Sequence, residues 1–216
     1  MKQALCLLFF LSACKPSSFF ISPNEVHKEK VVLYLNNHLK ENGEISISME
    51  ENSSMNAVYK PYIQFFPEGK STEEKISLNE IAGYSLDSDF YVLKKVEMFR
   101  DDIYNLLFVK RLTAENSKIQ LYELYESGRG NATGESKYSY FLSFPSYGPL
   151  KTLNTISHQV VPMFDQKMSM FVSDCPALAN KIKAKEKGYF IPFGSFKTFQ
   201  RREVLMKIID EYNHCN

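Results

Sequence analysis

The sequence predicts an α+β protein: a mainly antiparallel β-rich body, either a sheet or a small barrel, followed by a helical segment. Between residues 26 and 147, about eight short segments alternate apolar and polar residues and are separated by turn residues at intervals near ten. From residue 148 to 216 the apolar residues recur at helical spacing, which predicts about three helices. A run of strands followed by a run of helices is typical of the α+β class.

The β-rich region is read from segments rich in β-branched and aromatic residues. We expect strands at residues 30–35, 44–49, 62–66, 83–86, 90–99, 103–112, 118–126 and 136–144. The first two are expected to form a hairpin with Asn42-Gly43 at or near its turn, because Asn-Gly is a favoured hairpin turn. Asp101-Asp102 marks a second hairpin, and residues 77–81 suggest a short helical turn.

The helical region shows three apolar stripes. The first stripe consists of Val160, Phe164, Met168, Phe171 and Val172. A second helix is expected to begin after a Ser173 or Asp174 cap, with Pro176 in its first turn, and to end at Gly188. The last helix is expected from about Thr198 to Tyr212. The residues expected to face inward on these two helices are Leu178, Ala179, Ile182, Leu205, Ile208, Ile209 and Tyr212.

The first thirteen residues have the layout of a secretory signal: a charged Lys2, a short apolar run, and small residues before a cysteine. Leu-Ser-Ala-Cys at residues 11–14 resembles the bacterial lipobox. The resemblance implies cleavage before Cys14, diacylglycerol on its thiol and a further acyl chain, such as palmitate, on its amino group. The alternative is an ordinary signal peptide cut near Ala13 that leaves Cys14 free. Residues 14–25 are expected to be a tether.

The cysteines then divide by position. Cys6 leaves with the signal peptide and Cys14 carries the lipid, so Cys175 and Cys215 remain as one possible disulfide pair. Closing a loop of about 40 residues stabilises a fold by roughly 4 kcal/mol in the loop-entropy model. Two separate buried thiols are the alternative. A bridge between these positions ties the start of the second helix to the end of the last one.

Composition limits the classes of partner. Without Lys2, the 26 Lys and Arg residues fall to 25, which equals the 25 Asp and Glu residues. A neutral chain argues against a nucleic-acid partner, which favours a basic excess. No segment after residue 13 is apolar for 18 residues, so no transmembrane helix is expected. The aromatic content of 14% is enough to build a core, and residues 26–216 are expected to form one globular unit.

The carboxy-terminal residues carry a family resemblance. "DCPALANKI", followed about thirty residues later by "IIDEYNHC", resembles the ending of uncharacterised exported, lipoprotein-type proteins of Bacteroidota. In that family an Asp-Cys-Pro opens a helix and a Tyr-Asn-x-Cys closes the chain. The residues that match are Asp174, Cys175, Pro176, Tyr212, Asn213 and Cys215. The resemblance implies an exported compartment and a β-rich fold, but it implies no activity.

No motif in the chain specifies a reaction. The glycine-rich residues 128–134 lack the Gly-Lys-Ser/Thr ending of a phosphate-binding loop. None of the four histidines lies within five residues of another, so no metal or other cofactor is expected. Ser195 lacks the Gly-x-Ser-x-Gly motif of hydrolases. We therefore expect no catalytic residues and no enzyme activity.

The sequence thus favours a non-catalytic structural or interaction module in the cell envelope, held by its lipid to the outer membrane. Lys15 stands after the lipidated cysteine where Asp would favour the inner membrane. Its expected partners are the membrane and other envelope proteins. One alternative is a carrier of small apolar ligands, whose β cavity would be lined by Tyr122, Tyr138, Tyr140 and Phe144. A second is a hydrolase-type enzyme with a site assembled from distant residues.

Overall fold

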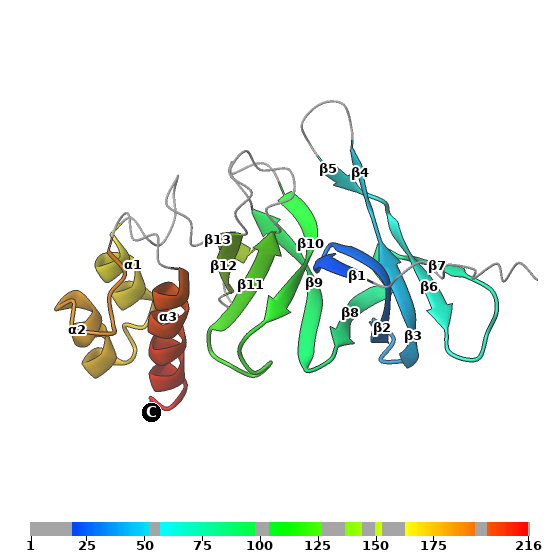
Figure 1. Cartoon of the computed structure of the whole chain (residues 1–216). Coiled ribbons are helices and arrows are strands. Elements are labelled where there is room, and N and C mark those ends of the chain that lie inside the picture. Colours follow the sequence, from blue (N-terminus) through cyan, green and yellow to red (C-terminus); the bar gives the residue numbers. More distant parts are fainter. Residues whose placement is uncertain are drawn as a thin grey trace, which may run out of the picture.

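The structure is a computed structural model, which confirms the α+β class: an antiparallel β body is followed by three helices (Figure 1). It describes residues 19–51, 57–97, 104–126, 137–143, 150–152, 163–192 and 198–215. Across these ranges, every helix is too short or too polar to cross a membrane.

The elements follow the predicted order, with more strands than the sequence suggested. The strands are β1 (Phe19–Ser22), β2 (Glu25–Leu35), β3 (Lys40–Ile47), β4 (Met49–Glu51), β5 (Ala57–Tyr59), β6 (Tyr62–Pro67), β7 (Glu74–Ser77), β8 (Ile81–Leu86), β9 (Asp89–Glu97), β10 (Tyr104–Arg111), β11 (Gln120–Glu126), β12 (Lys137–Ser143) and β13 (Leu150–Thr152). The helices are the short 3-10 turn η1 (Leu78–Glu80), α1 (Phe164–Phe171), α2 (Pro176–Lys183) and α3 (Thr198–Asn213). The expected helical turn at residues 77–81 is confirmed as η1.

Strand β9 joins two parts of the β body. On one side lies a sheet in the order β7-β6-β3-β2-β8-β9, with β1 added beside β2. On the other side, β9, β10, β11, β12 and β13 form a closed ring, because β13 pairs in parallel with β9. Residues 89–92 of β9 pair with β8, whereas residues 96 and 97 pair with β13. The same strand edge therefore serves first the sheet and then the ring.

Each part has its own apolar core, and alternation along the strands assigns residues to them. The residues packed inside the ring are Val92, Val96, Leu107, Val109, Tyr122, Leu124 and Phe141, each at most 7% exposed. Alternate residues of the same strands face outward. Those of β9 and β10, including Tyr91 and Phe108, join the core of the N-terminal sheet. Those of β11 and β12, including Leu121 and Leu142, pack against the helices.

A buried asparagine links the sheet to the ring. The side-chain amide of Asn24, only 3% exposed, donates from Nδ2 to the carbonyl oxygen of Phe108 at 3.0 Å. Its Oδ1 accepts the Phe108 backbone N–H at 2.7 Å. Beside it, the buried Tyr84 hydroxyl donates to the carbonyl oxygen of Pro23 at 2.8 Å. The turn between β1 and β2 thus acts as a neighbouring strand for β10 at a point where β10 would otherwise leave backbone groups unpaired.

Two sequence predictions in this region were wrong. Asn42-Gly43 lies within β3, and the β2–β3 hairpin turns at Asn36–Leu39 instead. Gly43 is needed for a different reason: a side chain there would collide with the Phe65 ring and the Phe66 carbonyl oxygen. The tether predicted over residues 14–25 also extends too far, because β1 begins at Phe19 and the Asn24 turn is buried.

The helices form a third layer against β11 and β12 (Figure 1). Their core contains the predicted inward residues Leu178, Ala179, Ile182, Leu205, Ile208, Ile209 and Tyr212. The first stripe is confirmed at Phe164, Met168 and Val172, whereas Val160 lies outside the described residues. The capping prediction for α2 was wrong. Cys175 is its N-cap residue and makes no side-chain cap, although Pro176 does occupy the first turn.

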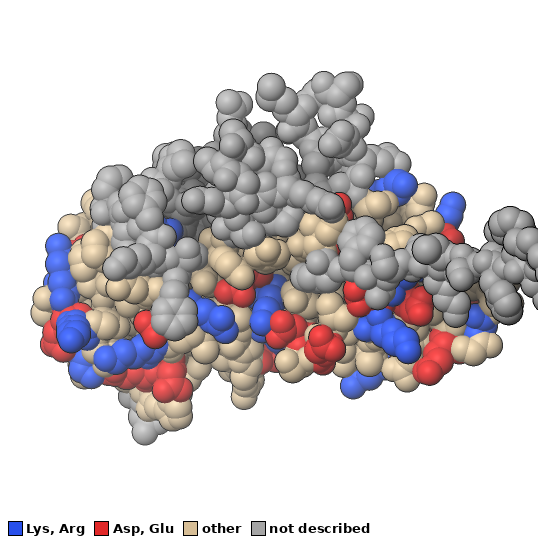
Figure 2. All heavy atoms as spheres, in the orientation of Figure 1, with Lys and Arg blue, Asp and Glu red and all other residues tan. Residues whose placement is uncertain are grey.

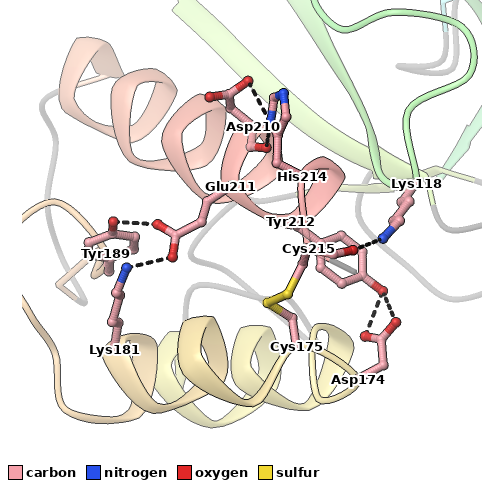
Figure 3. The surroundings of a disulfide bond; sticks show 10 residues. All are labelled: Lys118, Asp174, Cys175, Lys181, Tyr189, Asp210, Glu211, Tyr212, His214 and Cys215. Atoms are coloured by element: carbon pink, nitrogen blue, oxygen red, sulfur yellow. Dashed lines mark hydrogen bonds and ion pairs between the residues drawn. A yellow bond between two sulfur atoms is a disulfide. The ribbon is translucent and has the colours of Figure 1, made fainter.

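Residues at the chain's end fix α2, α3 and the ring to one another (Figure 3). A disulfide joins Cys175 to Cys215, with Cα atoms 6.0 Å apart. The Tyr212 hydroxyl donates to both oxygens of Asp174, at 2.8 and 2.9 Å, which explains why Asp174 does not cap α2. Asn213 Oδ1 accepts the backbone N–H of Lys118, just before β11, at 2.9 Å. The Asp-Cys-Pro and Tyr-Asn-x-Cys residues therefore act together as one clamp.

A second contact between the helices lies one turn farther back along α3, near the end of α2. The Glu211 carboxylate on α3 accepts Lys181 Nζ from α2 at 2.6 Å and the Tyr189 hydroxyl at 2.5 Å (Figure 3). These two donors lower the pKa of Glu211 below its ordinary value. Because Cys175 meets Cys215 while Lys181 meets Glu211, α2 and α3 run antiparallel along this contact.

We predict that Asn24→Ala lowers the free energy of unfolding by about 2–4 kcal/mol, because it leaves the Phe108 N–H and C=O buried without partners. Urea unfolding of the purified protein measures the change. Asn36→Ala is the matched control: its amide donates to the Asn79 carbonyl oxygen at 2.7 Å at an exposed site, so it costs under about 1 kcal/mol. Equal losses in the two variants would contradict the linking role of Asn24.

Replacing both bridge cysteines, Cys175→Ser with Cys215→Ser, is expected to cost about 4 kcal/mol, because the bridge closes a separation of 40 residues in the unfolded chain. The measurement compares urea midpoints of the double variant and the wild type, each with and without reductant. Reductant should lower only the wild-type midpoint. A double variant as stable as the oxidised wild type would show that the bridge does not stabilise the fold.

Candidate functional site

The described part of the chain contains an open groove of about 990 Å³. It runs from β2 across β8 and β9 and reaches β10 and β11. Its rim includes the turn between β2 and β3 and the loop that precedes β11. It lies where β9 separates from β8 to enter the ring, so the change of partner along β9 creates the opening.

Strand β8 shapes the floor of the groove through the size of its side chains. Tyr84 points into the core of the sheet and is fully buried. Its neighbours Gly83 and Ser85 lie on the opposite face, which is the groove face, because side chains alternate along a strand. A side chain at Gly83 would collide with the carbonyl oxygen of Tyr91, so β9 approaches β8 closely there. Small residues on β8 thus leave room between β2 and β9.

Two aromatic rings meet across this space and carry a cation at each end. Tyr34 on β2 contacts Phe90 on β9 edge to face, with ring centroids 4.9 Å apart. Lys40 Nζ lies 5.1 Å from the Tyr34 centroid, and the Arg111 guanidinium lies 4.8 Å from the Phe90 centroid. Cations held over aromatic faces are stabilised by the ring quadrupole. We call these four residues the cation–aromatic stack.

A third cation lies farther along the groove. Lys94 Nζ is 5.8 Å from the centroid of Tyr122. The Tyr122 side chain belongs to the core inside the ring of strands and also lines the groove. The Tyr122 hydroxyl donates to Oε1 of Gln120. Burial raises the pKa of Tyr122 to about 12, with a smaller opposing effect from Arg111. Tyr122 is therefore a neutral hydrogen-bond donor at physiological pH.

The groove charges are only partly compensated. Arg111 pairs with Glu115 at 3.3 Å, and Asp89 pairs with Lys110 at 2.7 Å. Within the described ranges, Lys40 and Lys94 have no carboxylate partner, and each is held by an aromatic ring instead. Figure 2 shows acidic and basic side chains interspersed over the visible face, with neither sign forming a continuous patch. The groove therefore offers separate cations in a setting of mixed charge.

The residues predicted to line an aromatic cavity are not brought together. Tyr122 faces the ring interior, whereas Tyr140 faces the helices. Burial, and then the neighbouring Glu123, raise the pKa of the Tyr140 hydroxyl well above its ordinary value. Tyr138 shares the outer face with Tyr140 and is 43% exposed. Phe144 and the predicted lipidation residue Cys14 lie outside the described residues.

Sequence reasoning missed the cation–aromatic stack because it placed the first hairpin turn wrongly. With the turn at Asn36–Leu39, Lys40 lies directly opposite Tyr34. A turn at Asn42-Gly43 would have left Lys40 on the same side of the hairpin as Tyr34, six residues farther along the chain. The usable signal was "GYS" at residues 83–85, in which a large residue stands between two small ones within a strand.

Among the residues that the structure describes, no group of three or more His, Cys, Asp or Glu side chains is placed to bind a metal ion. The groove lining provides cations, aromatic rings, carboxylates and neutral polar groups. Such groups bind and orient a ligand through charge-assisted hydrogen bonds and apolar contact.

The raised pKa of Tyr122, about 12, makes stability depend on pH in the alkaline range. The stabilisation that Tyr122 contributes is fully present below the ordinary tyrosine pKa of about 10 and is lost as pH rises towards 12. In this range the hydroxyl of Tyr122 loses its proton in the unfolded chain but keeps it in the folded protein. We expect Tyr122→Phe to reduce the fall in stability by about 1.4 kcal/mol per pH unit across this window. Urea unfolding at pH 9 and 11 measures the slope, and identical slopes in both proteins would contradict the assignment.

Comparison with known proteins leaves the groove to be interpreted from its own residues. No family model matches this chain, and searches of curated proteins and of solved structures find no match either. The resemblance of the Asp174–Cys215 region to exported Bacteroidota proteins therefore stays a prediction.

Proposed function

We propose that the protein is a non-catalytic binding module of the cell envelope, anchored by lipid on Cys14. The observation that carries the binding role is the open groove with its cation–aromatic stack. It is built on central strands of the sheet, where rigid backbone holds the side chains in place. An open groove on a rigid face suits reversible capture of a ligand from outside.

Two further features support export and anchoring. The sequence before Cys14 has the signal and lipobox pattern, and strand β1 begins five residues after Cys14, at Phe19. The Cys175–Cys215 disulfide is of the kind that persists in oxidising compartments. An outer-membrane location is our proposal for the anchor, from Lys15 at the position after the lipidated cysteine.

The alternative functions receive less support from the described residues. A carrier needs an enclosed cavity, but apolar side chains at most 7% exposed pack inside the ring. A smaller hollow beside Phe108 measures about 10 Å³, roughly room for one water molecule. No arrangement of the described residues specifically favours the hydrolase-type alternative, which stays a prediction without a site.

We expect Cys14→Ser to abolish incorporation of labelled fatty acid and to move most of the protein from the membrane fraction to the soluble fraction. The reason is that the thiol carries the diacylglycerol on which stable anchoring depends. Metabolic labelling followed by membrane fractionation makes the measurement. Cys6→Ser, a second cysteine change within the predicted signal, is the control and should keep both properties. A Cys14→Ser protein that remains lipidated and membrane-bound would refute the anchor.

A further inference from the structure

The two uncompensated cations identify the charge of the ligand. Lys40 and Lys94 both line the groove, and within the described residues neither has a carboxylate partner. Each ammonium lies over an aromatic ring, at 5.1 and 5.8 Å from the centroid, and this contact favours its position in the groove before a ligand arrives. A preorganised cation without an internal partner favours an anionic ligand.

The acids in the same groove limit how much negative charge the ligand carries. Asp87, Asp89 and Glu115 all line it. A polyphosphate, with a charge on every repeat, would be repelled by these carboxylates. A ligand with a few separated carboxylates can reach Lys40 and Lys94 while avoiding the acids. The groove therefore favours low charge density.

Over β2 and β8 the floor of the groove presents side chains and no free strand edge. Tyr34 is paired on both sides, with Lys40 on β3 and Gly83 on β8. Ser85 is likewise paired with Val32 and with Phe90. An extended peptide usually binds by adding to a free strand edge, and no free edge is present at these positions. The groove lining also includes the neutral polar residues Asn36, Asn79, Ser88 and Gln120.

Together these features point to one class of ligand. We propose that the groove binds an acidic oligosaccharide, a polyhydroxylated chain bearing carboxylates. Lys40 and Lys94 take the carboxylates, the neutral polar side chains take hydroxyls, and the half-buried rings of Tyr34 and Phe90 meet the C–H groups of the sugar. The inference rests on the proposed binding role of the groove and specifies its substrate class.

The test uses full-length protein in detergent and isothermal titration calorimetry at low salt. The probes are tetragalacturonic acid, its fully methyl-esterified form and an eight-nucleotide oligothymidylate. We expect binding of the free acid only. Lys40→Gln and Lys94→Gln should each weaken it about tenfold or more, because each removes a charge-assisted hydrogen bond. Lys75→Gln is the matched control: Lys75 Nζ lies 5.0 Å from the Tyr62 centroid, the same kind of contact outside the groove, so its binding should not change.

Each contrary outcome has a distinct meaning. Equal binding of acid and ester, or unchanged affinity in both groove variants, overturns the acidic-saccharide proposal. Binding of the oligothymidylate in preference to the acid overturns it in favour of a polyphosphate ligand. Failure of all three probes also overturns it, while the Cys14→Ser fractionation, which does not depend on the groove, continues to test the anchor. Urea midpoints of the lysine variants confirm that each has folded.

Discussion

The paired hydrogen bonds between the Asn24 amide and the Phe108 backbone are the constraint on which the β body depends. One edge of β10 pairs with β9 at Phe108, but its other edge pairs with β11 only at Lys110 and Arg111 and has no strand neighbour at Phe108. One side chain supplies the missing donor and acceptor. Because the sheet, the ring and the opening between them share β9, fixing β10 also fixes the shape of the groove.

Opposite faces of the same strands line the groove and build the core. On β8, Tyr84 fills the core while Gly83 and Ser85 leave the other face low. On β2 and β9, Tyr34 and Phe90 then meet across that low face, where they position Lys40 and Arg111. Alternate residues of the same strands therefore build the core on one face and the floor of the proposed binding groove on the other.

Local sequence patterns predicted the fold class, most of the strands and the helices. The cysteine pair was predicted by elimination, because only two cysteines remain after Cys6 and Cys14 are assigned to the signal and the lipid. The helical stripes at Leu178–Ile182 and Leu205–Tyr212 were readable because burial repeats every three or four residues. The ring closure, the Asn24 contact and the cation–aromatic stack were not, because each joins residues distant in sequence whose meeting depends on register. Asn42-Gly43 shows the limit clearly: the glycine is selected by the Phe65 ring, which no local rule can reveal.

The Asn24 turn also has a mechanical consequence. Strand β1 leaves the body from Phe19, which pairs with His27, so a pull on the amino-terminal end loads the β1–β2 pairs one at a time, starting with the outermost. This peeling is stopped at the turn, where Phe108 and Tyr84 hold Asn24 and Pro23 from the inside. The β1–β2 pairs therefore separate before the contacts that hold the Asn24 turn are loaded.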